Sequence, residues 1–196
     1  MAFTLQIGAR APDFSLPAVA GKRYTLGDFA LSPAIVVVFS CNHCPYVIGS
    51  QDRMNAFAEA YAEKGVSMIA INSNETENHP EDSFEHMVTY AAEKQFRFVY
   101  ARDDDQSVAL AYGALRTPHY YLFDDNLQLR YTGRMDNDPR DSANARTHEL
   151  RDAVDAVLSG IPVPVQMTNP IGCNVKWAGQ DGHWMPAEAC DLVPVS

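Results

Sequence analysis

The sequence lacks an excess of positive charge, and this argues against negatively charged binding partners. Among its 196 residues, 15 are Lys or Arg and 25 are Asp or Glu, so the formal net charge is -10. An acidic surface repels both phosphate backbones and anionic lipid headgroups. We therefore expect neither nucleic acid nor a membrane as a partner.

Long apolar runs are also absent. The longest, Ala34–Phe39, has the length of a strand and is too short to span a bilayer. The first 17 residues contain no basic segment followed by an apolar one, so they are not typical of a secretory signal. We expect a cytoplasmic protein.

Cysteine is scarce, because the chain contains only four. That is too few for a disulfide-stabilised scaffold, and a chain of this length buries a core without cross-links. We expect Cys173 and Cys190 to be free, packed thiols. The functional alternative is that one of them serves as an extra resolving thiol for Cys41 and Cys44.

Hydrophobic periodicity predicts alternating strands and helices. Strands are expected at Ala34–Phe39, Val66–Ile71, Phe96–Tyr100, His119–Phe123 and Leu127–Thr132. Helices are expected over Val47–Tyr61, Ser107–Tyr112 and Leu150–Leu158. A further helix is expected to begin at Pro80, with an apolar stripe that includes Val88. Strands that alternate with helices and end in a hairpin predict an α/β fold with a central mixed sheet flanked by helices.

We expect one domain over residues 1–160, of which residues 1–33 form an N-terminal extension with a short hairpin. Residues 161–196 are rich in Pro and Gly. They are expected to form an irregular tail packed on the domain, because Trp177 and Trp184 would be costly to expose.

The motif Cys41-Asn42-His43-Cys44 follows the first buried strand and precedes the first helix. The partial positive charge of a helix N-terminus stabilises a thiolate there and lowers its pKa. One such thiolate attacks a substrate disulfide, and the second cysteine resolves the mixed disulfide. A zinc site would need further ligands, and the spacing of Cys173 and Cys190 is not typical of zinc. The motif therefore predicts redox chemistry with no metal and no cofactor beyond the thiols.

Three segments together resemble the thioredoxin superfamily: SCNHCPYV after a buried strand, APDFSLP near the start, and Thr117-Pro118 before a strand. The resemblance is to its peroxiredoxin-like branch of redoxin, alkyl hydroperoxide reductase and thiol-specific antioxidant proteins. It covers about residues 5–160 and implies a thioredoxin-like fold. It also implies that Pro118 is a cis-proline that lies against the redox pair and helps to bind substrate backbone.

The resemblance also assigns roles around the cysteines. Asn42 and His43 would tune the reduction potential, and a protonated His43 would stabilise a neighbouring thiolate. Thioredoxins bury an acid in the strand before the motif, whereas Ala34–Phe39 contains none. Glu75, after the next strand, is our candidate for proton transfer.

The resemblance leaves the nucleophile ambiguous. Peroxiredoxins carry Pro-x-x-x-Thr/Ser-x-x-Cys, and alignment on Cys44 places Cys41 at the hydroxyl position and Val37 at the proline position. The thioredoxin pattern names Cys41 as the nucleophile and the peroxiredoxin pattern names Cys44. We favour Cys41, which we expect to lie nearer the surface.

The expected function is thiol–disulfide oxidoreductase, acting on protein or small-molecule disulfides and recycled by an external thiol reductant. The first alternative is an antioxidant thiol peroxidase that uses Cys44 as its peroxidatic cysteine. The second is a non-catalytic metal-binding or redox-sensing module built on Cys41, His43 and Cys44.

Overall fold

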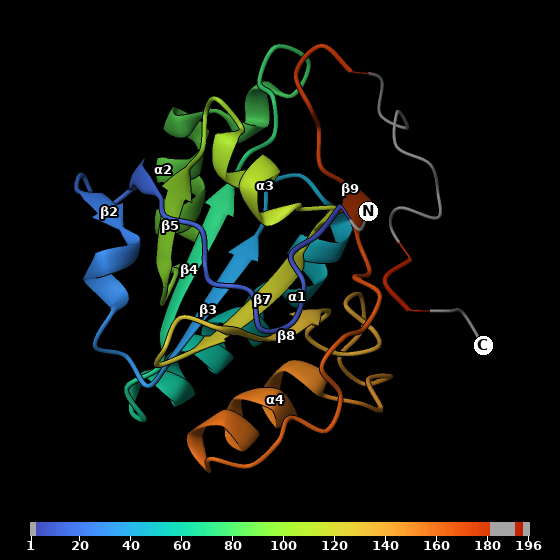
Figure 1. Ribbon diagram of the computed structural model, residues 1–196. Helices are drawn as coiled ribbons and strands as arrows, with labels where there is room; N and C mark the ends of the chain where they lie inside the picture. The colour runs from blue at the N-terminus through green and yellow to red at the C-terminus, as the bar shows by residue number, and fades with distance from the viewer. Residues whose placement is uncertain (1–2, 181–190, 194–196) are drawn as a thin grey trace.

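The six-residue apolar run of the sequence forms the central strand of the sheet, β3 (Ala34–Phe39), and every residue of it is buried. In the computed structural model, which describes residues 3–180 and 191–193, the sheet has the strand order β5-β4-β3-β7-β8 (Figure 1). Strands β4 (Ser67–Asn72) and β5 (Val99–Arg102) continue the sheet in parallel. Strands β7 (His119–Asp124) and β8 (Leu129–Gly133) add the antiparallel edge. The predicted mixed sheet is confirmed.

Helices α1 (Pro45–Ala62), α2 (Phe84–Glu93) and α4 (Glu149–Leu158) cover one face of the sheet. Their apolar side chains pack against Val36 and Val38, the residues of β3 that point to that side. The period of two in a strand sends the alternate residues of β3 to the opposite face. The strand is therefore apolar throughout because helices or loops cover both of its faces.

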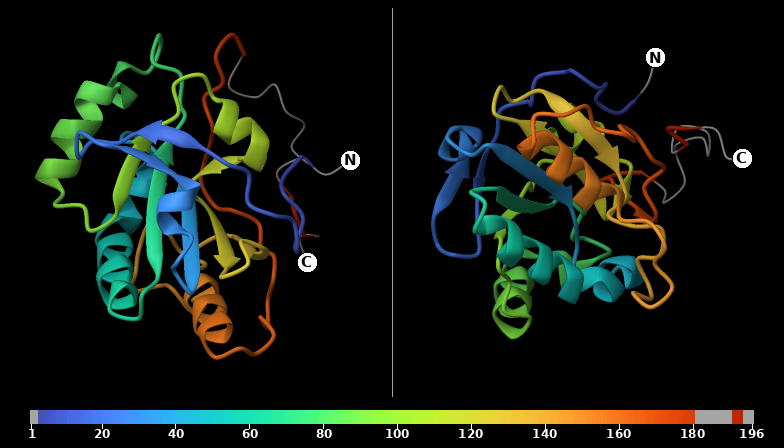
Figure 2. Two further views of the ribbon diagram at one scale, coloured as in Figure 1. Left: turned by 60° about the vertical axis from the view of Figure 1, so that its left-hand side comes forward. Right: turned by 90° about the horizontal axis from the view of Figure 1, so that it is seen from below.

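The opposite face is covered by three segments that are distant in sequence. These are the N-terminal extension, helix α3 (Ser107–Tyr112) and the tail around Val175 and Trp177. Figure 2 shows the blue N-terminal extension and the teal α1 on opposite sides of the sheet. Of the two tryptophans expected to anchor the tail, Trp177 packs in this core, whereas Trp184 lies outside the described residues.

Two small sheets flank the main one. The expected N-terminal hairpin consists of β1 (Ser15–Pro17) and β2 (Arg23–Thr25), followed by the 3-10 helix η1 (Leu26–Phe29). The second pairs β6 (Arg116–Thr117) with β9 (Cys173–Asn174). This pairing brings the tail to the loop that begins β7.

The helix expected from Pro80 is divided in two. Residues Pro80–Asp82 form a 3-10 turn, η2, and α2 begins only after Ser83. Ser83 is extended, and its hydroxyl oxygen accepts a hydrogen bond from the His86 backbone N–H as an N-cap. The break lets Asp82 point into the protein, where its side chain is fully buried.

Two further expectations about this region were wrong. Val88, expected in the apolar stripe of the helix, is 40% exposed. The strand expected at Phe96–Tyr100 begins at Val99 instead. Phe96 and Phe98 are apolar because their rings pack together, with centroids 4.6 Å apart, beside the hydrophobic core and outside any strand.

Within the part of the chain that the structure describes, no helix is both long and apolar enough to cross a membrane.

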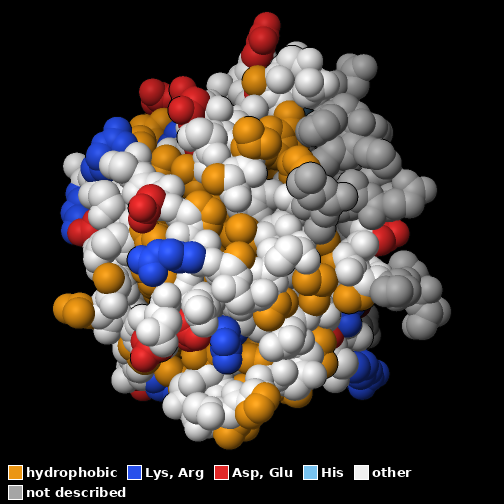
Figure 3. All heavy atoms as spheres, in the orientation of Figure 1, with side chains coloured by type: hydrophobic (Ala, Val, Ile, Leu, Met, Phe, Trp, Pro, Cys, Tyr) orange, Lys and Arg blue, Asp and Glu red, His pale blue; other side chains and the backbone are white. Residues whose placement is uncertain are grey.

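On the face seen in Figure 3, acidic and basic side chains are scattered among apolar and neutral ones.

Two glycines offer a test of how the N-terminal segment packs. Gly113 and Gly160 both have positive φ, at 63° and 67°, so an alanine strains the backbone equally at both positions. A Cβ on Gly113 would lie 2.1 Å from the Phe3 carbonyl oxygen, whereas one on Gly160 meets nothing within 4 Å. We expect Gly113→Ala to lower the free energy of unfolding by about 1–3 kcal/mol more than Gly160→Ala, in urea titrations of both variants. Equal losses would show that the N-terminal segment does not pack tightly there.

Candidate active site

The two cysteines of the motif lie between the end of β3 and the start of α1. Cys44 is the N-cap of α1, with Pro45 in the first turn. Cys41 is 1% exposed and Cys44 is 0% exposed, and together with Val47 they form a small hydrophobic cluster. Both cysteines are buried, so the expectation that Cys41 lies nearer the surface, which was our reason to favour it as the nucleophile, was wrong.

The loop between β6 and β7 lies directly against both thiols. The Thr117–Pro118 peptide bond is cis, as the resemblance implied. The Cys41 thiol donates to the Thr117 hydroxyl oxygen at 3.4 Å, and the Cys44 thiol donates to the Thr117 carbonyl oxygen at 3.1 Å. Thr117 thus contacts both sulfurs, through its side chain and its backbone.

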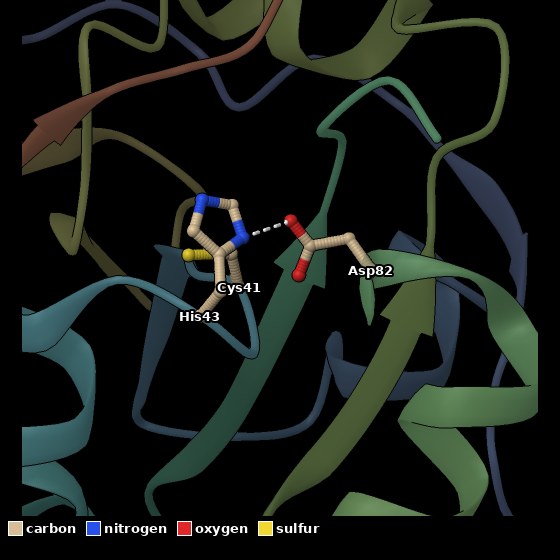
Figure 4. A group of neighbouring side chains, drawn as sticks. All are labelled: Cys41, His43 and Asp82. Carbon is tan, nitrogen blue, oxygen red and sulfur yellow. Dashed lines mark ion pairs between the residues drawn. The ribbon is translucent and has the colours of Figure 1, made fainter. Parts of the chain in front are cut away.

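A buried carboxylate, Asp82, lies beside the motif. Its Oδ1 accepts hydrogen bonds from the Asn42 backbone N–H at 2.7 Å and from the Asn72 side chain at 3.2 Å. Its Oδ2 accepts one from the Asn74 side chain at 2.8 Å and lies 2.8 Å from His43 Nδ1. Figure 4 shows the imidazole and the carboxylate side by side next to Cys41. Ligating atoms of Cys41, His43 and Asp82 lie within 4.8 Å of one another.

The sequence had proposed Glu75 for this region, and the structure gives Glu75 a different environment. Its Oε2 accepts the backbone N–H groups of Glu77 at 2.8 Å and Asn78 at 3.0 Å, so the side chain closes its own loop. The carboxylate that the structure brings to Cys41 is Asp82. Polar residues at the carboxyl end of a buried strand, here Asn72 and Asn74, are the only sequence signal for such a site.

The other motif residues are held by their own contacts. Asn42 accepts a hydrogen bond from the Tyr100 hydroxyl at 2.8 Å and donates one to the Glu81 carbonyl oxygen at 2.7 Å. The His43 ring stacks on the ring of His79 with a centroid separation of 4.9 Å. The dipeptide between the cysteines is therefore fixed to the loop before α2.

The Asp82–His43 contact sets the charges around Cys41. Burial acts to raise the pKa of Asp82, but hydrogen bonds from His43, Asn42 and Asn74 outweigh it and hold the pKa below its usual range. The same contact raises the pKa of His43 above 6.5. Burial is the main cause that raises the pKa of Cys41, and the hydrogen bond to Cys44 and the negative charge of Asp82 add to it. These causes oppose ionisation of Cys41.

Cys44 is in the opposite environment. Its hydrogen bond with Cys41 is the main cause that lowers the pKa of Cys44 to about 4, and hydrogen bonds with Cys173 and Val47 act in the same direction against burial. The Thr117 carbonyl oxygen, which accepts from the thiol form, opposes ionisation, but the donors around the sulfur outnumber it. The hydrogen bonds around its sulfur therefore favour ionisation of Cys44.

Comparison with known proteins places these features in a family context. The family model for redoxin matches residues 6–148. Thiol-disulfide oxidoreductase ResA of Bacillus thuringiensis is 26% identical over 120 residues, which cover 61% of this chain and 65% of ResA, slightly less than two thirds of that relative.

Two solved structures are similar over more of the chain. A hypothetical protein from Sinorhizobium meliloti is 38% identical with a TM-score of 0.84, over 90% of this chain and 97% of that one. An uncharacterized conserved protein from Geobacillus kaustophilus is 40% identical with a TM-score of 0.84, over 90% of this chain and 94% of that one.

Replacing Asp82 with Asn tests whether its charge controls the neighbouring groups. In Asp82→Asn the pKa of His43 should fall, because the carboxylate that raises it is gone. The pKa of Cys41 should fall as well, and a fall of one unit raises its thiolate fraction about tenfold at neutral pH. NMR titration of His43 and alkylation of Cys41 by iodoacetamide, in a Cys44→Ser background, measure the two shifts.

The matched control is Asp103→Asn, which removes a carboxylate that is also buried but bonds Ser73 and the start of α3. We expect neither pKa to move in that variant. Unchanged values in Asp82→Asn would show that Asp82 does not govern the thiols.

Proposed function

The chain belongs to the redoxin family, and from that membership we propose that it is a thiol–disulfide oxidoreductase whose redox centre is the Cys41–Cys44 pair. The observation that carries the proposal is the unequal environment of two adjacent thiols. Hydrogen bonds with Cys41, Cys173 and Val47 lower the pKa of Cys44, whereas burial and the charge of Asp82 raise the pKa of Cys41. A nucleophilic thiolate next to a protonated partner is what disulfide exchange requires.

The exchange proceeds in two steps. The Cys44 thiolate attacks one sulfur of a substrate disulfide, which forms a mixed disulfide and releases the other sulfur as a thiolate. Cys41 then loses its proton and attacks the Cys44 sulfur, which forms the Cys41–Cys44 disulfide and releases the second substrate thiol. The substrate gains two electrons, and an external thiol reductant returns them to the pair.

Asp82 and His43 would handle the proton of Cys41. Ligating atoms of all three residues lie within 4.8 Å of one another, so the carboxylate can pass that proton toward the departing thiolate. These roles reverse the sequence-based preference for Cys41 as the nucleophile. The reason is that the hydrogen-bond donors of the site converge on the sulfur of Cys44.

Peroxidase activity is less well supported. The low pKa of Cys44 would suit a peroxidatic cysteine, but Cys41 replaces the hydroxyl residue of the peroxiredoxin pattern. The Thr117 hydroxyl contacts Cys41 at 3.4 Å, so it does not replace that group at Cys44. The geometry thus favours disulfide exchange over peroxide reduction.

Single substitutions test the dithiol proposal. We expect Cys44→Ser to lower the rate of insulin reduction with dithiothreitol on the order of 10³-fold, because it removes the attacking thiolate. Cys41→Ser should lower the rate as well, because it removes the resolving thiol of the pair. Cys190→Ser, which leaves the pair intact, should keep its rate. Full activity in both variants of the pair would reject the proposal, provided that circular dichroism shows all three proteins folded.

A second candidate, metal binding, is favoured by the cluster of Cys41, His43 and Asp82. His43 Nδ1 is buried and lies 2.8 Å from Asp82 Oδ2. A structural zinc site takes four ligands, whereas this cluster offers three. The group of His43, His79 and Glu81 that shares its histidine offers three as well, and hydrogen bonds already occupy both oxygens of Asp82.

We therefore expect the reduced protein to lose added Zn²⁺ to EDTA during desalting, as measured by atomic absorption. Retention of one equivalent that disappears in Asp82→Asn but persists in Asp103→Asn would make metal binding the better reading of the site.

A further inference from the structure

A third thiol, Cys173, lies at the redox pair. Strand β9 pairs antiparallel with β6, and the register places Cys173 opposite Thr117, the residue before the cis-proline. Cys173 is partly buried and packs against the cluster that contains Cys41 and Cys44. Its thiol and its backbone N–H are near enough to the Cys44 sulfur to lower the pKa of Cys44.

The approach of the tail to this loop is built into the sequence at Gly172. A Cβ on Gly172 would lie 2.2 Å from the Thr117 carbonyl oxygen and 2.6 Å from its carbon, so only glycine fits without displacement. The Arg116 side chain crosses the pairing and donates to the Gly172 carbonyl oxygen and to the side-chain oxygen of Asn174. Cys173 therefore sits in a specific contact between the tail and the loop.

The residues after Cys173 anchor the tail in the fold. Val175 and Trp177 are only 2% and 9% exposed and belong to the hydrophobic core. The Lys176 backbone donates to the Asn74 side chain at 2.9 Å and accepts from the Gln106 side chain at 2.8 Å. Cys173 is thus held beside Cys44 by an ordered segment on both sides.

We propose that Cys173 is a second resolving cysteine for Cys44, an inference that rests on the proposed disulfide exchange. When Cys44 carries a mixed disulfide with a substrate sulfur, the Cys173 thiolate attacks the Cys44 sulfur. The Cys44–Cys173 bond forms, the bond to the substrate sulfur breaks, and the substrate leaves as a thiolate that takes up the proton given up by Cys173. Cys44 and Cys173 are oxidised, the substrate disulfide is reduced to two thiols, and the external thiol reductant restores the pair.

The charges around Cys173 suit this role. Burial is the main cause that raises its pKa to about 11, and the hydrogen bond to Cys44 and the charge of Cys44 raise it further, while Lys176 and Arg116 act in the opposite direction. Formation of the mixed disulfide removes the charge of Cys44, and the two cations remain. Cys173 then ionises more readily at the step that needs its thiolate, whereas Asp82 still opposes ionisation of Cys41.

Oxidised glutathione added to the Cys41→Ser variant isolates the second resolving thiol. We expect a Cys44–Cys173 disulfide, identified by proteolysis and mass spectrometry, and only a short-lived glutathione adduct on Cys44. In Cys41→Ser/Cys173→Ser the adduct should last at least about tenfold longer, because an intramolecular attack is lost.

A glycine substitution tests the geometry without removing a thiol. In the Cys41→Ser background, Gly172→Ala should lengthen the lifetime of the adduct toward that of the double variant, because its Cβ pushes β9 away from Thr117. Gly27→Ala is the matched control, since its Cβ meets only the Thr25 hydroxyl oxygen at an ordinary 3.6 Å. Circular dichroism establishes that each variant is folded.

The outcomes separate this inference from the proposed function. If Cys41→Ser keeps its adduct as long as the double variant, or pairs Cys44 with Cys190, Cys173 is not the resolving thiol. A Cys41–Cys44 disulfide in the unaltered chain would then leave the proposed function standing. If the unaltered chain forms no disulfide at Cys44 under any glutathione ratio, both proposals fail.

Discussion

The buried charge of Asp82 is the constraint around which the site is organised. An ionised carboxylate without partners would destabilise the fold by several kcal/mol. The Asn42 backbone, the Asn72 and Asn74 side chains and His43 supply those partners. These groups come from the Cys41–Cys44 motif and from the end of β4, so the Asp82 side chain holds these two segments together. Its inward orientation goes with the break between η2 and α2, where the sequence predicted one helix from Pro80.

The same carboxylate makes the environments of the two thiols unequal. Its charge lies on the side of Cys41, where it opposes ionisation, while the hydrogen-bond donors of the tail and of α1 converge on Cys44. Plain helix-terminus reasoning gives both cysteines the same positive environment. Part of the asymmetry arises from groups that lie outside the motif, namely Asp82 beside Cys41 and Cys173 beside Cys44, and it favours ionisation of the second cysteine.

Local patterns sufficed for much of the fold and for little of the site. Ala34–Phe39 and Ser107–Tyr112 were predicted with their observed bounds, because apolar composition and a stop signal at Gly113 determine them locally. Asp82 was missed because its partner Asn42 is 40 positions away, and only the folded chain brings them together. The position of Cys173 likewise depends on the close contact between the backbones of Gly172 and Thr117, which hydrophobic periodicity cannot predict.

The tail also constrains what can reach the site. Strand β9 occupies the edge of β6 at Thr117, next to the cis-proline that the family resemblance assigns to binding substrate backbone. A peptide that pairs with Thr117 in the same antiparallel sense needs the groups that β9 already uses, so the two are mutually exclusive. A protein substrate that bound there would therefore have to displace the strand that carries Cys173. If Cys173 resolves the mixed disulfide as proposed, access and resolution would be coupled through this one segment. With β9 displaced only Cys41 could resolve the mixed disulfide, and with β9 paired either thiol could.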